Sequence, residues 1–294
     1  MDKIILNLKN KIDFYWFYWE NLRKEKKFKI CESDFKLSDF KLSDFKFTVE
    51  KVIEYLDKGK LRVISFSKKK KIIINEWIKK AILIYFKIKK IKLIEFGKFK
   101  FFDKIPLKTN FNANGVRVVP TAIARYGSFI SKNVILMPSY VNIGAFIGKE
   151  SMIDTWATIG SCAQIGNRVH ISGGVGIGGV LEPLQNSPVI IGNNVFIGSR
   201  CILVEGVIVE DEAVLGANVV LTASTKIIDV TNVTKKISKG LIPKRSVVIP
   251  GSYSKIFKSG KYYVPCALII GKRKKSTDKK TSLNDVLRKY NISV

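Results

Sequence analysis

The sequence predicts a mainly β chain wound into a parallel coil, with a mostly α-helical domain before it and a short β cap after it. Three observations support this fold class: an apolar residue recurs every six positions, the positive charge is confined to the two flanks, and the flanks lack the six-residue period. Helices repeat a face every 3.6 residues and strands every two, so a period of six requires short straight segments separated by corners. We expect three such segments to make each turn of the coil.

The six-residue period runs through the middle of the chain in two series. The first series is Ile123, Phe129, Ile135, Val141, Ile147, Ile153, Ile159, Ile165, Ile171 and Ile177. The second series is Ile191, Ile197, Leu203, Val209, Leu215, Leu221 and Ile227. Between them the phase slips by two residues at Leu181 to Pro188. We expect all these side chains to point into the coil, and the interruption to leave it as a loop.

Charge divides the chain into three parts. Residues 1–110 carry a net charge of +15 and residues 228–294 carry +13, whereas residues 111–227 are neutral. We predict an N-terminal helical domain at 1–110, the coil at 111–230, and a C-terminal β cap and tail at 231–294. Clustered Lys is typical of nucleic-acid binding. Here Lys is scattered among Ile and Phe without a nucleic-acid motif, so we expect solvated surface Lys and no nucleic-acid partner.

The N-terminal part shows helical spacing. Val49, Val52, Ile53 and Leu56 share one helix face, Gly59 is a plausible stop, and Glu76 to Ile84 predicts a second helix or a helix-to-strand junction.

Two other N-terminal segments have no regular amphipathic pattern. The six aromatics from Phe14 to Trp19 favour packing in a small core over a base-stacking platform. Residues Asp34 to Phe47 nearly repeat a five-residue unit, and we expect a linker that is disordered or irregularly helical.

The C-terminal part predicts short capping strands at Lys244 to Gly251 and Tyr262 to Gly271, then a short helix at Ser282 to Tyr290. The four Cys are isolated from one another, which favours a reduced, cytoplasmic protein. Lys residues interrupt every apolar run well before about 20 residues, so we expect no membrane span.

Several segments are more specific than the period requires. They are Arg117-Val-Val-Pro120, Met137 to Gly144, Asp154 to Gly166, His170 to Gln185 and Val204-Glu-Gly206. Together they resemble the tetrahydrodipicolinate N-succinyltransferases, a family of hexapeptide-repeat acyltransferases. The resemblance implies a left-handed coil and a homotrimer with sites between neighbouring coils. It also implies transfer of succinyl from succinyl-CoA to the amine of L-2-amino-6-oxopimelate, in the diaminopimelate and lysine pathway, without a permanently bound cofactor. N-acetyl transfer to the same substrate is the alternative.

Two carboxylates are candidate catalytic residues. Asp154 follows the inward Ile153, so we expect its carboxylate on the outer wall beside Trp156, where it would bind the substrate's ammonium and remove its proton. Its alternative is a solvated surface acid. Glu205 is the second candidate, with an ordinary corner acid as its alternative. The family often has another acid three residues before Glu205, where this chain has Ile202, so the second carboxylate stays open.

The remaining candidates concern binding. Arg117 suits the substrate's carboxylates because a guanidinium binds a carboxylate through two parallel hydrogen bonds. Gly173, Gly174 and Gly178 would leave bare backbone for the pantetheine arm of CoA. Positive partners for its phosphates are proposed as a group: Lys226, Lys244, Arg245 and Lys258. His170, the only histidine, is a less favoured base, and a single His excludes the three-His metal site of coil-shaped carbonic anhydrases, so no metal is expected.

Overall fold

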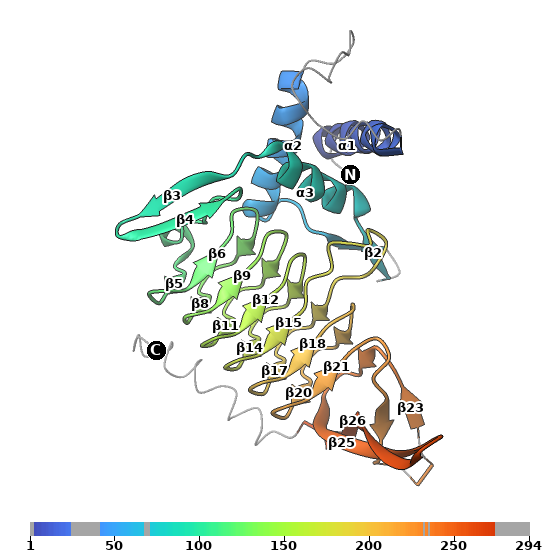
Figure 1. The fold of residues 1–294 in the computed structure, drawn as a ribbon. Coiled ribbons are helices and arrows are strands. Elements are labelled where there is room, and N and C mark those ends of the chain that lie inside the picture. Colours follow the sequence, from blue (N-terminus) through green and yellow to red (C-terminus); the bar gives the residue numbers. More distant parts are fainter. Residues whose placement is uncertain (1–2, 25–41, 68–70, 232, 235, 274–294) are drawn as a thin grey trace.

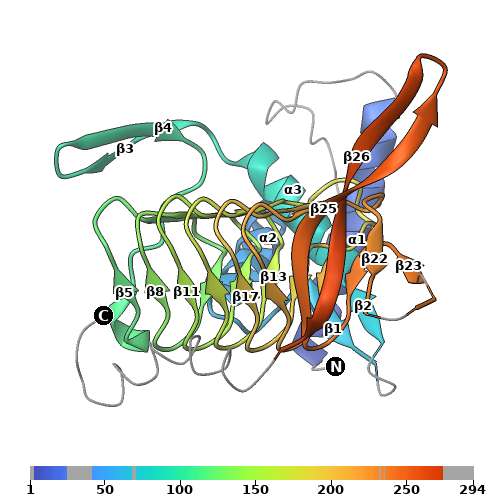
Figure 2. The same cartoon turned by 90° about the horizontal axis from the view of Figure 1, so that it is seen from below.

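The structure is a computed structural model that describes residues 3–24, 42–67, 71–231, 233–234 and 236–273. Within these residues, a coil of short parallel strands forms the centre, and helices lie along one side of it (Figure 1). The described residues also form three hairpins. Two precede the coil in the chain, β1 with β2 (Ile64–Phe66, Ile72–Ile74) and β3 with β4 (Lys92–Phe96, Phe99–Asp103), and the third follows it, β25 with β26 (Ser246–Phe257, Gly260–Lys272). Figure 2 shows the second and third projecting near opposite ends of the coil.

Each turn of the coil contributes one strand to each of three sheets. The first sheet contains β5 (Arg117–Val118), β8 (Ile135–Leu136), β11 (Met152–Ile153), β14 (His170–Ile171), β17 (Phe196–Ile197) and β20 (Val214–Leu215). The second contains β6 (Ile123–Ala124), β9 (Tyr140–Val141), β12 (Thr158–Ile159), β15 (Gly176–Ile177), β18 (Ile202–Leu203) and β21 (Val220–Leu221). The third contains β7 (Phe129–Ile130), β10 (Phe146–Ile147), β13 (Gln164–Ile165), β16 (Ile190–Ile191), β19 (Ile208–Val209) and β24 (Leu241–Ile242). All these neighbours pair in parallel, which confirms the predicted coil. Three kinds of corner link the strands. The first corner joins a strand of the first sheet to the next strand, in the second sheet. The second corner joins the second sheet to the third, and the third corner returns the chain from the third sheet to the first.

The inward side chains follow the prediction from Val141 onward, and the first three predicted members are wrong. Ala124, Ile130 and Leu136 are the residues that fill the first turn of the core, one position after the predicted Ile123, Phe129 and Ile135. Leu136 and the next inward residue, Val141, are five positions apart instead of six, so one corner is a residue shorter. The sequence concealed this shift because both residues of each affected strand are apolar.

The predicted interruption at Leu181–Pro188 is confirmed as a loop at the second corner. It separates β15 from β16, and β16 then pairs with β13, so the coil resumes in register. Its first residue, Leu181, packs against the N-terminal core.

The N-terminal helices are α1 (Lys3–Lys24), α2 (Leu42–Asp57) and α3 (Glu76–Ile88). The four residues predicted to share one face of α2, Val49, Val52, Ile53 and Leu56, are buried, and Gly59 follows the helix with a φ of +68°. Their core also contains Ile143 and Cys162 of the coil, so the helices pack against the second corner.

Among the aromatic residues of α1, the packing interpretation is confirmed for Tyr15, Trp16 and Trp19, which belong to this core, while Phe14 and Phe17 are exposed.

The linker prediction for Asp34–Phe47 is wrong where the structure tests it, because Leu42–Phe47 begins the regular helix α2. Tertiary contacts explain this outcome: Phe45 is buried with its ring 4.8 Å from that of Tyr15, and Asp44 accepts hydrogen bonds from Lys11 and Tyr15. Residues 34–41 lie outside the described residues.

The C-terminal cap continues the first sheet. β25 pairs in parallel with β20, β26 pairs antiparallel with β25, and β22 (Ile227–Asp229) and β23 (Lys236–Ser238) complete the sheet. These strands cover the backbone edge of the last turn. The predicted short strands are wrong in length, since β25 has 12 residues and β26 has 13; the two pair with each other beyond the coil. The helix predicted at 282–290 lies outside the described residues.

The three-part division at residues 110 and 230 stays a prediction. No helix in the described part of the chain is long and apolar enough to cross a membrane.

Candidate active site

Asp154 lies at the first corner, immediately after β11. Its Oδ1 accepts hydrogen bonds from the backbone N–H of Thr155 (2.7 Å) and from the Thr155 hydroxyl (3.3 Å), so its own turn fixes the half-buried carboxylate. Trp156, two residues later, has a φ of +62° and a side chain that is 79% exposed. Left-handed backbone is a regular feature of the corners of this coil, since Asn133, Glu150 and Cys162 also have positive φ, so the exposed indole is what distinguishes this corner. Two of the three predicted substrate contacts, Asp154 and Trp156, therefore lie in one corner, and the third is Arg117.

His170 lies one turn further along the same sheet, opposite Met152 on β11. Its ring stacks on Phe196, with centroids 5.1 Å apart and planes inclined by 24°. Burial lowers the pKa of His170 below its ordinary value of 6.5, and the negative charge of Asp154 opposes this shift. His170 is therefore a mostly neutral imidazole that interacts electrostatically with Asp154.

Arg117 is exposed on β5, the first strand of the same sheet. The sheet runs β5, β8, β11, so two strand spacings, about 10 Å, separate Arg117 from the strand that precedes Asp154. Arg117 and Asp154 thus lie along one edge of the coil at a distance that a molecule with several carbons can span.

Glu205 lies at the second corner, between β18 and β19, with a φ of +56°. Its exposed side chain accepts a hydrogen bond at Oε2 from the backbone N–H of Ala223 (3.1 Å). The next residue, Gly206, packs against the end of the loop, since a Cβ there would lie 2.5 Å from the Ser187 carbonyl oxygen. Within one chain, Asp154 and Glu205 stand at different corners and are not brought together.

The predicted glycines flank β15 of the second sheet. Gly174 lies at the first corner, where its N–H donates to the Thr155 carbonyl at 2.9 Å and its φ is +67°. Gly178 lies at the second corner, where a Cβ would come within 2.7 Å of Val204. Packing between turns therefore accounts for Gly178, independently of any ligand. Gly176, between these corners, packs against Ile202 of the next turn, since a Cβ there would lie 2.8 Å from Ile202 Cδ1.

The predicted basic residues divide into two places. Lys226 follows β21, and its Nζ lies 4.0 Å from the centroid of the Tyr253 ring. It lines a cavity of about 870 Å³ together with two lysines that the sequence analysis did not select, Lys239 and Lys255. Lys258 lies exposed in the turn between β25 and β26.

Lys244 and Arg245 lie at the third corner, away from Lys226. Both approach Glu212: the Arg245 guanidinium forms an ion pair with this carboxylate, and Lys244 Nζ lies 3.6 Å from its Oε1. Arg245 also donates to the Arg273 carbonyl at 2.9 Å. The positive charge of these two residues is therefore already partly neutralised by the protein.

Two cations were not among the predicted site residues: Arg62, which is half-buried, and Lys79. Lys79 of α3 is fully buried, and its Nζ donates to the Asn186 carbonyl of the loop at 2.6 Å. Lys79 stands three residues before Ile82, and this helical spacing would have placed Lys79 on the apolar face of α3. No group of three or more potential metal-binding His, Cys, Asp or Glu side chains occurs among the described residues.

Two family models match the chain. Residues 7–88 match "Tetrahydrodipicolinate N-succinyltransferase N-terminal", and residues 188–223 match "Hexapeptide repeat of succinyl-transferase". The second match lies within the coil, which is a left-handed parallel β-helix of hexapeptide repeats as the resemblance implied.

Curated relatives match over most of both chains. The 2,3,4,5-tetrahydropyridine-2,6-dicarboxylate N-succinyltransferase of Acinetobacter baylyi is 51% identical over 250 residues, which cover 82% of this chain and 88% of the relative. The enzymes of the same name from Polynucleobacter asymbioticus and Methylobacillus flagellatus are each 49% identical, over 82% and 81% of this chain and 88% and 87% of their own lengths. On this identity and coverage, the chain belongs to the 2,3,4,5-tetrahydropyridine-2,6-dicarboxylate N-succinyltransferase family.

Proposed function

We propose that this chain transfers the succinyl group of succinyl-CoA to the amine of L-2-amino-6-oxopimelate, the ring-opened form of tetrahydrodipicolinate, in diaminopimelate and lysine biosynthesis. The observation that carries this proposal is the 51% identity to a curated succinyltransferase over 82% of the chain. The corner that holds Asp154 and Trp156 supplies the chemistry.

The reaction requires a neutral amine. An α-amino group has an ordinary pKa of about 8, so a large fraction is protonated at neutral pH. Asp154 pairs with the ammonium and accepts its proton, and the nitrogen then attacks the thioester carbonyl carbon. The C–N bond forms and the C–S bond breaks. The nitrogen loses two protons in all: one goes to Asp154 and then to solvent, and the other goes to the departing CoA thiolate, which leaves as the thiol. The Thr155 N–H, 2.7 Å from Oδ1, fixes the direction of this carboxylate.

A second carboxylate comes from a neighbouring chain in this proposal. One subunit keeps Asp154 and Glu205 at different corners, so a shared site requires a cleft between two coils of a homotrimer. Cyclic symmetry would generate three identical clefts, each using the first corner of one coil and the second corner of the next. Arg117, about two strand spacings from β11, then holds a carboxylate of the substrate.

The CoA arm follows the second sheet in this proposal. The path starts at β15, between the two corners that contain Gly173, Gly174 and Gly178, and passes the side chain of Ile202, which packs beside Gly176. The sheet continues from β15 through β18 to β21, and Lys226 follows. The cavity that Lys226 shares with Lys239 and Lys255 suits the phosphates of CoA. Lys244 and Arg245 are weaker candidates because Glu212 already pairs with them.

We expect the protein to act in the cytoplasm on small molecules, without nucleic-acid or membrane partners and without a permanently bound cofactor. The choice of acyl donor is tested by measuring release of the CoA thiol from succinyl-CoA and from acetyl-CoA, each with L-2-amino-6-oxopimelate as the acceptor. Faster turnover of succinyl-CoA supports the proposal, and faster turnover of acetyl-CoA contradicts it. Salt-dependent DNA binding without thioester chemistry would favour a nucleic-acid role instead.

The CoA path has its own test. Lys226→Gln is expected to raise KM for succinyl-CoA with little change in kcat, because it removes a contact to a group remote from the reacting carbonyl. Lys244→Gln, at the other corner, is the matched control and is expected to leave KM near the wild-type value. Equal effects of both substitutions would contradict the assigned path.

A further inference from the structure

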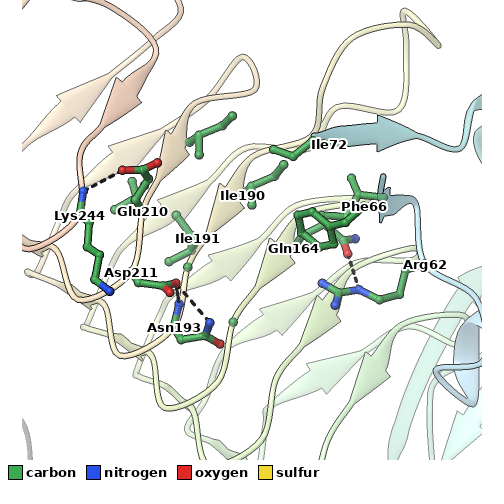
Figure 3. A pocket seen from close by; sticks show the side chains of 15 residues that line it. Arg62, Phe66, Ile72, Gln164, Ile190, Ile191, Asn193, Glu210, Asp211 and Lys244 are labelled. Atoms are coloured by element: carbon green, nitrogen blue, oxygen red, sulfur yellow. Dashed lines mark hydrogen bonds between the residues drawn. The ribbon is translucent and has the colours of Figure 1, made fainter. Parts of the chain in front are cut away.

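A second cavity lies away from the proposed active site, between the β1–β2 hairpin and the outer face of the third sheet (Figure 3). Its volume is about 480 Å³, within the range of small-molecule sites. Ile64, Phe66 and Ile72 of the hairpin and Ile190 and Ile208 of the coil form its walls. The cavity is therefore mostly apolar.

One end of this cavity holds the guanidinium of Arg62. Its Nε donates to Gln164 Oε1 at 3.1 Å, and the group lies over the Phe146 ring, 3.6 Å from its centroid. The two terminal nitrogens have no hydrogen-bond or ion-pair partner among the described residues, and Figure 3 shows them directed into the cavity. Burial lowers the pKa of Arg62 to about 10. Arg62 is half-buried, and partly removing a cation from water without a counter-ion is unfavourable, so a bound anion would stabilise this group.

The protein holds this guanidinium in a fixed orientation. Gln164 is almost fully buried, and its Nε2 donates to the Cys162 carbonyl at 2.9 Å. With the amide nitrogen engaged, the amide oxygen is directed at Arg62. Gln164 holds the guanidinium at Nε, and the Phe146 ring packs against its face. The N–H groups on the two terminal nitrogens therefore form a preformed fork. A planar fork of this kind matches the two oxygens of a carboxylate.

The other end of the cavity carries two carboxylates, Glu210 and Asp211, and the ammonium of Lys244, so its net charge is negative. Asp211 accepts hydrogen bonds from the Asn193 backbone N–H (2.6 Å) and side chain (3.2 Å), and Glu210 accepts one from the Lys244 backbone N–H (2.9 Å). Lys244 also lies 3.6 Å from a carboxylate oxygen of Glu212, so the net negative charge at this end disfavours a multiply charged anion such as phosphate. From the terminal nitrogens of Arg62, unpaired among the described residues, the apolar walls and this net negative end, we infer that the cavity binds a small aliphatic carboxylate, with its carboxylate on Arg62 and its chain against the isoleucines.

Hexanoate is the probe that tests this inference, with hexan-1-ol as an uncharged probe of similar shape. Titration calorimetry on the full-length protein is expected to show saturable binding of hexanoate, and binding of hexan-1-ol about tenfold weaker or more, because a hydrogen bond to a charged group is lost. Arg62→Met keeps an apolar stem over Phe146 and is expected to weaken hexanoate binding by a similar factor. Asp154→Asn is expected to leave it unchanged.

A second variant separates the site from the stability of the Arg62 region. Ile208→Phe fills the cavity while keeping the guanidinium, and it is expected to abolish hexanoate binding. Absence of hexanoate binding to the wild-type protein, equal binding to Arg62→Met, or displacement of hexanoate by inorganic phosphate would overturn the inference. Loss of binding in Asp154→Asn would also overturn it, since the carboxylate would then occupy the proposed active site. Succinyl transfer is measured separately, so its failure leaves this result intact.

Discussion

Replacing Asp154 with Asn removes a charge with little change of shape. The amide oxygen of Asn still accepts the Thr155 N–H, which now donates to Asp154 Oδ1 at 2.7 Å. The corner therefore keeps its turn. The variant loses the negative charge that attracts an ammonium and the site that accepts its proton.

The expected loss of rate follows from this local geometry. General base catalysis contributes about 10²- to 10⁴-fold, so kcat should fall by about that factor, or about 3 to 5.5 kcal/mol of transition-state stabilisation. Stability should change by no more than about 0.5 kcal/mol, because the half-buried side chain keeps its hydrogen bond to the backbone. Affinity for succinyl-CoA should be unchanged, since Asp154 acts on the amine.

Asp229 in the C-terminal cap provides a matched control. Its Oδ1 also accepts from a nearby threonine, through the Thr231 N–H (3.0 Å) and hydroxyl (2.6 Å). The assay compares thioester consumption and thermal unfolding of Asp154→Asn and Asp229→Asn. Full activity in Asp154→Asn would refute its role as a base. An equal loss of activity in Asp229→Asn would show that the effect is not specific to the carboxylate of Asp154.

Three further predictions concern His170, Lys79 and the stacking of turns. His170 is the only histidine, so its single NMR imidazole signal should titrate below 6.5, and lower still in Asp154→Asn because the Asp154 charge raises this pKa. The unfolded chain then binds the proton more readily, so the His170 contribution to stability is retained above pH 6.5 and lost as the pH falls toward the folded pKa. Lys79→Met should free the loop at the second corner and speed its amide hydrogen exchange by about tenfold or more, through loss of a charged hydrogen bond. Gly160→Ala should destabilise the coil by about 1 to 3 kcal/mol or more in chemical unfolding, since its Cβ would lie 2.1 Å from the Gly179 nitrogen.

Each of these predictions has a result that contradicts it. A His170 pKa above 6.5 would show that burial does not dominate its environment. Lys80→Met is the control for Lys79: it removes a half-buried lysine of the same helix, α3, that pairs with Asp13 of α1, and it should leave loop exchange unchanged. Gly271→Ala is the control for the coil, because no atom lies within 4 Å of its Cβ and its φ is not positive. Equal destabilisation by both glycine substitutions would reject close packing between turns as the cause.

The coil was predictable because its period is tied to burial. Every inward residue from Val141 onward occupies the expected position, since a misplaced polar side chain would have to enter the core. At the first turn the constraint fails: Ile135 and Leu136 are both apolar, and only the length of the next corner decides which one points inward. The lengths of β25 and β26 were missed for a related reason. These strands pair with each other beyond the coil, where the six-residue period no longer applies.

The candidate site was predictable only in part. Family motifs identified Asp154 and Trp156, and the structure places them in one corner. Motifs do not reveal that Glu205 stands at a different corner from Asp154, and whether a neighbouring chain brings the two together depends on the assembly. The basic residues were chosen by proximity in sequence, and the coil separates Lys226 from Lys244 onto different corners. Arg62 escaped notice because its partner Gln164 is a hundred residues away in the sequence.

The most direct test of the central claim, a site shared between chains, is subunit complementation. Asp154→Asn and Glu205→Gln are each expected to be inactive alone as homotrimers. When they are unfolded together in equal amounts and reassembled, about a quarter of the clefts should combine an intact Asp154 with an intact Glu205, so about a quarter of wild-type activity should return. Two inactive variants that regain no activity in mixed trimers would contradict the account.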